Sequence, residues 1–119
     1  MRTGLRRADE SAEFFTDERC HILELSGGAD DPELSIARAR VEPGVTTQLH
    51  VLDIPERFVV VSGQGEVEVG EERAAVGPGD VVLIPAGTPQ RITNTGDRDL
   101  VFYCMCTPAW KPEAYRTLE

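Results

Sequence analysis

Hydrophobic and polar residues alternate along most of the chain, in short runs separated by glycine, proline and acidic residues. Runs of about four to eight residues with this alternation predict β-strands, and no segment keeps the repeat of an amphipathic helix. The predicted strands are Cys20–Leu25, Ser35–Val41, Gln48–Leu52, Arg57–Ser62, Glu66–Val69, Arg73–Val76, Val81–Ile84, Gln90–Asn94 and Asp99–Cys106. Many short strands with turn sequences between them are typical of an antiparallel sandwich or barrel.

Two segments depart from simple alternation. Val81–Ile84 is continuously apolar, which predicts a strand covered on both faces. The tail Thr107–Glu119 contains Trp110, Tyr115 and Leu118, which are too apolar to remain in free solvent. We expect this tail to pack on its own barrel or on a partner subunit.

Length and composition favour one globular domain over residues 1–119. The chain has 119 residues, of which 40% are hydrophobic and 28% charged, a composition typical of a folded protein. Twelve basic against 21 acidic residues give a net charge of −9, which argues against a nucleic-acid partner. Neither a signal peptide nor an apolar stretch of membrane-spanning length is recognisable, so no membrane partner is expected. An odd number of cysteines, Cys20, Cys104 and Cys106, favours reduced thiols and a cytoplasmic location.

Two spaced motifs in the central half of the chain resemble those of the cupin family. The first, at about 43–63, consists of Gly44, His50, Glu56 and Gly63, with Leu52 where the family has a second histidine. The second, at about 79–94, consists of Gly79, Pro85, Gly87, Gln90 and Asn94, with Gln90 where the family usually has histidine. The resemblance implies an all-β, single-domain cupin fold, that is, a double-stranded β-helix or jelly-roll barrel.

The resemblance also implies a site inside the barrel. His50, Glu56 and Gln90 occupy positions that bind a divalent metal in many cupins, and such a nitrogen and oxygen set suits Fe, Mn, Ni or Zn. Strand alternation places Gln48 on the same face as His50, where it could be a fourth ligand. The alternative is a metal-free pocket, in which His50 and Gln90 form hydrogen bonds and Leu52 belongs to the wall. A carboxylate such as Glu56 must pair, coordinate or stay protonated inside a barrel, which favours the metal.

Two further side chains are candidates for contact with a substrate. Arg38 shares a strand face with Arg40 and could hold an anionic group if that face lines the cavity, although a solvated sheet face is the commoner arrangement. The phenol of Tyr103 could reach a substrate or could pack in the core.

We therefore expect a small metal-dependent enzyme of the oxygenase, isomerase or lyase type that acts on a small organic molecule. Glu56 would act as a general base when it leaves the metal. The alternative is a non-catalytic module or sensor that binds a sugar-like or aromatic molecule, because one fold serves many uses. A dimerising structural protein with a vestigial pocket is a third possibility. A homodimer is expected in either leading case.

Overall fold

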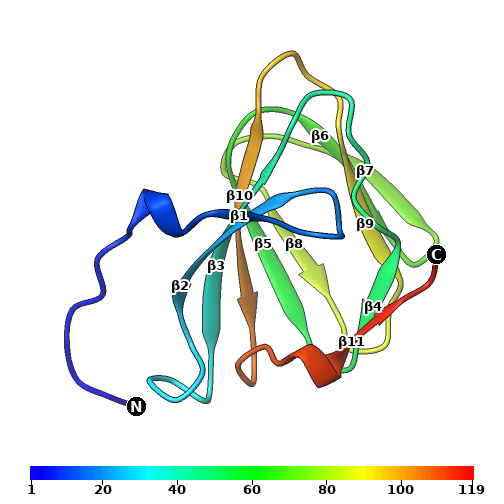
Figure 1. The fold of residues 1–119 in the computed structure, drawn as a ribbon. Helices are drawn as coiled ribbons and strands as arrows, with labels where there is room; N and C mark the ends of the chain where they lie inside the picture. Colours follow the sequence, from blue (N-terminus) through cyan, green and yellow to red (C-terminus); the bar gives the residue numbers. More distant parts are fainter.

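The computed structural model describes residues 1–119 and contains two antiparallel sheets that face each other (Figure 1). The strands are β1 (Phe14–Phe15), β2 (His21–Ser26), β3 (Ser35–Val41), β4 (His50–Leu52), β5 (Glu56–Ser62), β6 (Gly65–Val69), β7 (Glu72–Val76), β8 (Val81–Ile84), β9 (Gln90–Asn94), β10 (Leu100–Cys106) and β11 (Tyr115–Thr117). One sheet has the order β1-β2-β3-β10-β5-β8 and the other β11-β4-β9-β6-β7. Two short 3-10 helices, η1 (Glu10–Ala12) and η2 (Pro112–Ala114), complete the fold. The all-β cupin architecture expected from the motifs is confirmed.

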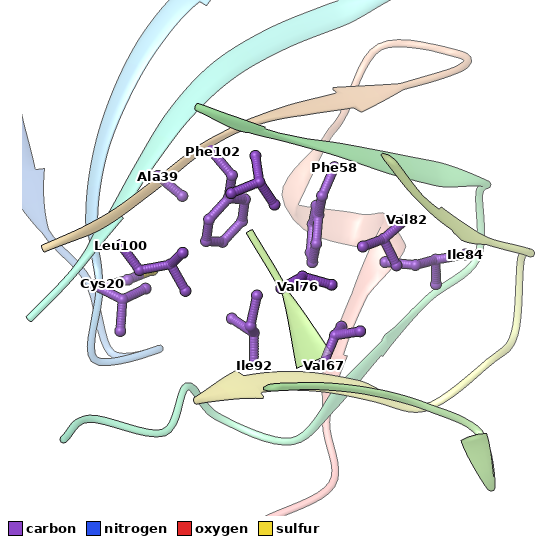
Figure 2. Close-up of a cluster of buried hydrophobic side chains, with 12 residues drawn as sticks. Cys20, Ala39, Phe58, Val67, Val76, Val82, Ile84, Ile92, Leu100 and Phe102 are labelled. Atoms are coloured by element: carbon purple, nitrogen blue, oxygen red, sulfur yellow. The ribbon is translucent and has the colours of Figure 1, made fainter. Parts of the chain in front are cut away.

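The hydrophobic core fills the space between the sheets. Figure 2 shows Phe58 of β5 and Phe102 of β10 pointing from the six-stranded sheet towards Val67 and Ile92 of the other sheet. The two phenyl rings lie with their centroids 4.6 Å apart, within the range that favours tilted aromatic pairs. Alternate residues of these strands face the core because successive side chains of a strand point to opposite sides of the sheet.

Strand register brings the motif residues to one end of the sandwich. On β4, His50 pairs directly with Gln90 of β9 in the five-stranded sheet. In the facing sheet, Glu56 begins β5 and lies opposite Cys106, the last residue of β10. The ends of four strands from two sheets therefore surround a common space.

Strand β8 corrects one sequence-based prediction. Val82 and Ile84 are buried, but the side chains of Val81 and Leu83 are 57% and 69% exposed, so the strand is covered on one face only. The physical reason is its position at the edge of the six-stranded sheet, where it pairs with β5 alone and nothing in the chain covers the outer face. A continuous apolar run cannot reveal which of its residues face outward.

The C-terminal tail packs on its own barrel, which was one of the two expected arrangements. Strand β11 extends the five-stranded sheet by pairing with β4, and the Leu118 N–H donates to the carbonyl of Leu49. Strands β1 and β11 are the two short edge strands that the sequence pattern did not predict. No helix in this structure has the length and apolarity needed to cross a membrane.

Candidate functional site

A cavity of about 620 Å³ begins at the end where β4, β5, β9 and β10 meet and extends along β2, β3 and the turn between them. Its walls are largely apolar, with Ile22, Phe58 and Phe102 among the side chains that line them. A few polar groups, including His50 and Glu56, lie among these apolar walls. A concave, largely apolar space with a small number of polar groups is the usual form of a small-molecule site.

The structure brings together the three polar residues that the motifs pointed to. His50, Glu56 and Gln90 all line the cavity and are 6%, 8% and 1% exposed. The Gln90 Nε2 donates a hydrogen bond of 2.8 Å to Glu56 Oε1, which links the five-stranded sheet to the six-stranded one. The other carboxylate oxygen, Oε2, accepts a weaker bond of 3.5 Å from the thiol of Cys106.

His50 is held in one tautomer by the backbone beside it. Its Nδ1 lies 2.8 Å from the carbonyl oxygen of Gln48. A carbonyl can only accept, so Nδ1 carries the proton, and Nε2 of the neutral imidazole keeps a free lone pair. The ring stacks on Tyr115 of β11, with centroids 4.9 Å apart and planes inclined by 22°. The imidazole is therefore fixed in orientation with one nitrogen available as an acceptor or base.

Glu56 is a buried carboxyl group with no arginine or lysine in an ion pair with it. Burial raises the pKa of Glu56 above its ordinary value near 4.5, and the hydrogen bond from Gln90 and the nearby His50 oppose that shift only in part. A carboxyl group with a raised pKa keeps its proton to a higher pH than an ordinary one, so it can serve as a general acid as well as a general base.

Glu18 is a second cavity carboxyl group, and the sequence analysis missed it. It lies in the turn between β1 and β2, with its Oε1 3.7 Å from His50 Nδ1. Burial raises the pKa of Glu18 as well, and the nearby His50 opposes that shift. No motif spacing marks this residue, because an acidic residue in a turn is ordinarily solvated. Only the folding of the turn over the barrel end brings it to the cavity.

The other predicted site residues are divided between the cavity and the outside of the barrel. Leu52 lines the cavity wall. The side chain of Gln48 is engaged by the hydroxyl of Tyr115, which donates to its Oε1, so this amide is not directed at Glu56 or Gln90.

Arg38 and Tyr103 do not line the cavity, contrary to the hypothesis that they contact a substrate. On β3, Ala37 and Ala39 face inward, so alternation directs Arg38 outward, where it donates to the carboxylates of Glu10 and Glu13. Tyr103 is paired with Arg38 across β10 and β3 and lies on the same outer face, 37% exposed.

The donor set does not fit the divalent-metal site that the motifs imply. Both oxygens of Glu56 accept hydrogen bonds, and the Gln90 amide presents its NH₂ group, which cannot ligate, to that carboxylate. Leu52 stands where a second imidazole would be. No group of three or more His, Cys, Asp or Glu side chains is arranged to hold an ion.

The thiols that line the cavity do not supply the missing ligands. Burial raises the pKa of the Cys20 thiol to about 12, and burial also raises the pKa values of Cys104 and Cys106. Nucleophilic attack requires the thiolate, and no group of three or more His, Cys, Asp or Glu side chains is formed with these thiols to hold an ion. The three cysteines therefore behave as small buried hydrophobic groups.

Comparison with known proteins agrees with this fold and motif arrangement. Residues 37–106 match the family described as "Cupin domain" (Cupin_2), and the chain belongs to this family. An uncharacterized protein of Methanocaldococcus jannaschii is 33% identical over 86 residues, which are 71% of this chain and 69% of that protein. Endoribonuclease YbeY of Myxococcus xanthus is 27% identical over 99 residues, which cover 82% of this chain but only 34% of the length of that relative.

Among solved structures, Streptomyces PAC13 with uridine superimposes with a TM-score of 0.80 at 18% sequence identity. The alignment covers 98% of this chain and 93% of the PAC13 chain. PAC13 is described as a unique nucleoside dehydratase with a β-barrel structure. At this level of identity the similarity establishes the shared fold alone.

Proposed function

We propose that this cupin is an enzyme that binds a small organic molecule in its barrel and moves a proton on it, in a reaction of the isomerase or lyase type. The observation that carries the proposal is the meeting of His50 and Glu56 in one largely apolar cavity, without an arginine or lysine paired to the carboxyl group. Structural ion pairs hold charges in place, whereas a buried carboxyl group with a raised pKa and no cationic partner is typical of acid–base sites.

The two residues have complementary roles in the proposed reaction. The free Nε2 of His50 takes a proton from the substrate, while its Nδ1–H remains bound to the carbonyl of Gln48. In an elimination, the protonated Glu56 gives its proton to the leaving group. In an isomerisation, it gives its proton to a second carbon atom of the substrate. The amide of Gln90 keeps the carboxyl group in position through the bond to Oε1. Positioned proton transfer of this kind is worth roughly 10²–10⁴ in rate.

The similarity to PAC13 supports a proton-transfer function on a small molecule. That protein has the same fold, was solved with uridine and is described as a dehydratase. Dehydration removes a proton and a hydroxyl group from neighbouring atoms, which is chemistry that a base and an acid can perform together. A ring-bearing molecule of nucleoside size is compatible with a cavity of about 620 Å³.

This proposal replaces the metal-dependent reaction that the motifs predicted. The reason is the donor set described above, in which the NH₂ group of Gln90 faces the Glu56 carboxylate and a leucine stands at one ligand position. The non-catalytic binding module remains the competing candidate, because the cavity would hold a ligand equally well without chemistry.

The test begins with a thermal-shift screen of small molecules in the presence of a chelator, followed by incubation of each stabilising compound in D₂O. Proton NMR then detects exchange of a C–H proton or elimination. We expect at least one compound to exchange or react, and we expect His50→Gln and Glu56→Gln to slow the reaction about 100-fold or more. Glu66→Gln, on the outer hairpin of β6 and β7, is the matched control and should react like the wild type.

Three results would contradict the proposal. Ligands that bind and are returned without exchange would indicate the binding module. Activity that appears only after Fe, Mn, Ni or Zn is added, with a bound equivalent detected by elemental analysis, would restore the metal-dependent enzyme. Equal activity of the wild type and the two site variants would move the chemistry away from this cavity.

A further inference from the structure

The polar end of the cavity offers hydrogen-bond acceptors in excess of donors. The carboxyl groups of Glu18 and Glu56 both line it, and they lie near enough that the charge of Glu18 raises the pKa of Glu56. A third acceptor is Oε1 of Gln90, which has no hydrogen-bond partner in the protein. Because Gln90 is only 1% exposed, bulk water does not satisfy this atom. Buried carbonyl oxygens are almost always satisfied in folded proteins, so this atom indicates a donor that is supplied from outside the chain.

No lysine or arginine side chain of the protein pairs with these acceptors. The only basic side chain within 4 Å of the Glu18 carboxyl group is His50, which forms an ion pair only when it is protonated, and Glu56 has no ion pair. Two arginines line more exposed parts of the cavity, but each is already paired. Arg6 binds Asp30 at 3.0 Å and Arg91 binds Glu68 at 2.6 Å.

The remaining cationic residues near the cavity do not change this picture. Lys111 lines the cavity but is exposed to solvent. Arg57, the neighbour of Glu56 in sequence, donates to the hydroxyl of Thr107 and does not line the cavity. The lining of the cavity therefore includes two carboxyl groups and a glutamine with an unpartnered, buried amide oxygen, without a fixed positive charge from lysine or arginine paired to them.

We propose that the ligand of this cavity is an organic cation, with a protonated amino group seated among Glu18, Glu56 and the Gln90 Oε1 and an apolar body against Ile22, Phe58 and Phe102. An ammonium group has three N–H donors and no acceptor, which matches three acceptor residues that line one cavity from a turn, β5 and β9. The inference rests on the proposed small-molecule function and names the class of molecule on which it acts.

A carboxylate or phosphate ligand would meet the same acceptors unfavourably. An anion beside two buried carboxyl groups opposes their ionisation, because like charges would then meet in a medium of low dielectric constant. A neutral alcohol has one donor and so satisfies only one of the three acceptors. The affinities of an anionic and of a neutral ligand can both be compared with that of an amine by using molecules of nearly equal shape.

The test uses matched triplets of fragments, such as benzylamine, benzyl alcohol and benzoate, together with the cyclohexylmethyl equivalents. Binding to the wild-type protein near neutral pH, in the presence of a chelator, is followed by chemical-shift changes in the ¹H–¹⁵N spectrum. We expect the amines to shift cavity amides and to bind about tenfold or more tightly than the alcohols, because charge-assisted hydrogen bonds are the stronger ones. The carboxylates should not bind.

Substitutions then test which residues cause the preference for amines over alcohols. Glu18→Gln and Glu56→Gln should each reduce the ratio of amine to alcohol affinity, and Glu66→Gln should leave it unchanged. Circular dichroism shows whether each variant is folded, and the wild-type triplets provide a result that requires no variant at all.

The inference is overturned if alcohols or carboxylates bind as tightly as the amines, if no amine shifts a cavity amide, or if the preference survives both cavity substitutions. Displacement of the amine by a stoichiometric amount of Zn²⁺ or Mn²⁺ would assign the acceptors to a metal and would also overturn it. Failure here is distinguishable from failure of the proposed function. Proton exchange on a neutral or anionic substrate would keep the enzyme and reject the cation, whereas amine binding without exchange would do the reverse.

Discussion

Two glycines of the cupin motifs show how similar backbone angles place different demands on a side chain. Gly63 and Gly79 have φ values of +87° and +90°, in the region that L-residues rarely adopt. A Cβ atom on Gly63 would lie 2.6 Å from the carbonyl oxygen of Asp99 and 2.8 Å from the Cα of Leu100. A Cβ atom on Gly79 would meet nothing within 4 Å. Gly79 is therefore required for its dihedral angle, and Gly63 for its dihedral angle and its lack of volume.

We predict that Gly63→Ala destabilises the protein much more than Gly79→Ala. The second substitution should cost about 1–2 kcal/mol for the positive φ alone. The first adds a collision with backbone atoms, which cannot move away as a side chain can, and should cost more than about 3 kcal/mol. Urea denaturation of the two variants and the wild type measures the difference. Equal losses would show that the neighbouring strand gives way.

The buried carboxyl group of Glu56 predicts a specific pH dependence. Because burial raises its pKa in the folded state, the folded protein binds the proton more tightly than the unfolded chain. The contribution of this group to stability is therefore complete below about pH 4.5, its ordinary pKa, and is lost as the pH rises through the raised value.

We predict that Glu56→Gln becomes progressively more stable relative to the wild type as the pH rises above about 4.5, because the amide never ionises. Thermal unfolding of the two proteins at a series of pH values measures this difference in Tm. Glu66→Gln is the control, and its difference from the wild type should not grow with pH in the same way. A constant difference for Glu56→Gln would mean that the carboxyl group ionises in the fold as it does in water.

At the scale of single residues, motif spacing predicted which side chains meet but not how they bond. His50, Glu56 and Gln90 were predicted from the resemblance of two spaced motifs to those of the cupin family, and strand alternation then placed His50 on one face with Gln48 and Leu52. The bond from Gln90 to Glu56 joins the two sheets and depends on their separation, which no local pattern contains. Glu18 depends in the same way on a turn that folds over the barrel end.

The short C-terminal strand β11 contributes to the site although it lies far from the motifs in sequence. It carries Tyr115, which stacks on His50. The strand is followed by Glu119, whose carboxylate accepts hydrogen bonds from Arg19, the shortest at 2.8 Å, and one of 2.6 Å from the Leu49 N–H. These contacts attach the end of the chain to the turn before β2 and to the residue before β4.

We predict that Glu119→Gln loosens β11 locally with little effect on global stability. The side chains of the Arg19–Glu119 ion pair are 45% and 35% exposed, and pairs so accessible to solvent contribute at most about 1 kcal/mol. Hydrogen exchange should therefore accelerate for the amides of β11 and Leu118, while the Tm changes only slightly. Glu113→Gln, in the exposed η2 turn, is the control. Unchanged exchange in β11 would show that its pairing with β4 is sufficient.

The positions of the strands in the sequence were predicted more reliably than the burial of their faces. Every one of the nine strands expected from alternation is present, with ends displaced by a residue or two. The two strands that were missed, β1 and β11, are only two and three residues long, too short for a period of two to be recognised. Strand β8 was predicted, but the prediction that both of its faces are covered was wrong, because sheet order decides whether an apolar strand is central or at an edge.

At the scale of the whole molecule, the outer face of the six-stranded sheet carries an apolar surface. Val61, Val81 and Leu83 on the adjacent strands β5 and β8 are 43%, 57% and 69% exposed. Tyr103 of the neighbouring β10 lies on the same face and is 37% exposed. The tail, which was expected to offer dimer surface, is used within its own chain, so this sheet face is the better candidate for self-association.

We predict a homodimer that pairs through this outer face, with each copy covering the other, as a two-fold interface requires. Leu83→Glu would place a charge within that contact, at its most exposed residue, and should convert the dimer to a monomer without loss of the fold. Light scattering coupled to size-exclusion chromatography measures the mass. Ala74→Glu, on an exposed position of β7 in the other sheet, should remain dimeric. A monomeric wild-type protein, or a dimeric Leu83→Glu variant, would contradict the prediction.

The amino-acid sequence by itself determined nine of the eleven strands and the turns between them, because these depend on side-chain alternation and on local turn residues. Its resemblance to the cupin motifs placed His50, Glu56 and Gln90 within one barrel. The tertiary structure decided the chemistry of the cavity. It joined Gln90 to Glu56, brought in Glu18 and Tyr115, directed Arg38 away and left one face of β8 bare. Each of these results depends on how distant strands pack in three dimensions, and the free energy of that packing is a property of the assembled sheets and of no single segment.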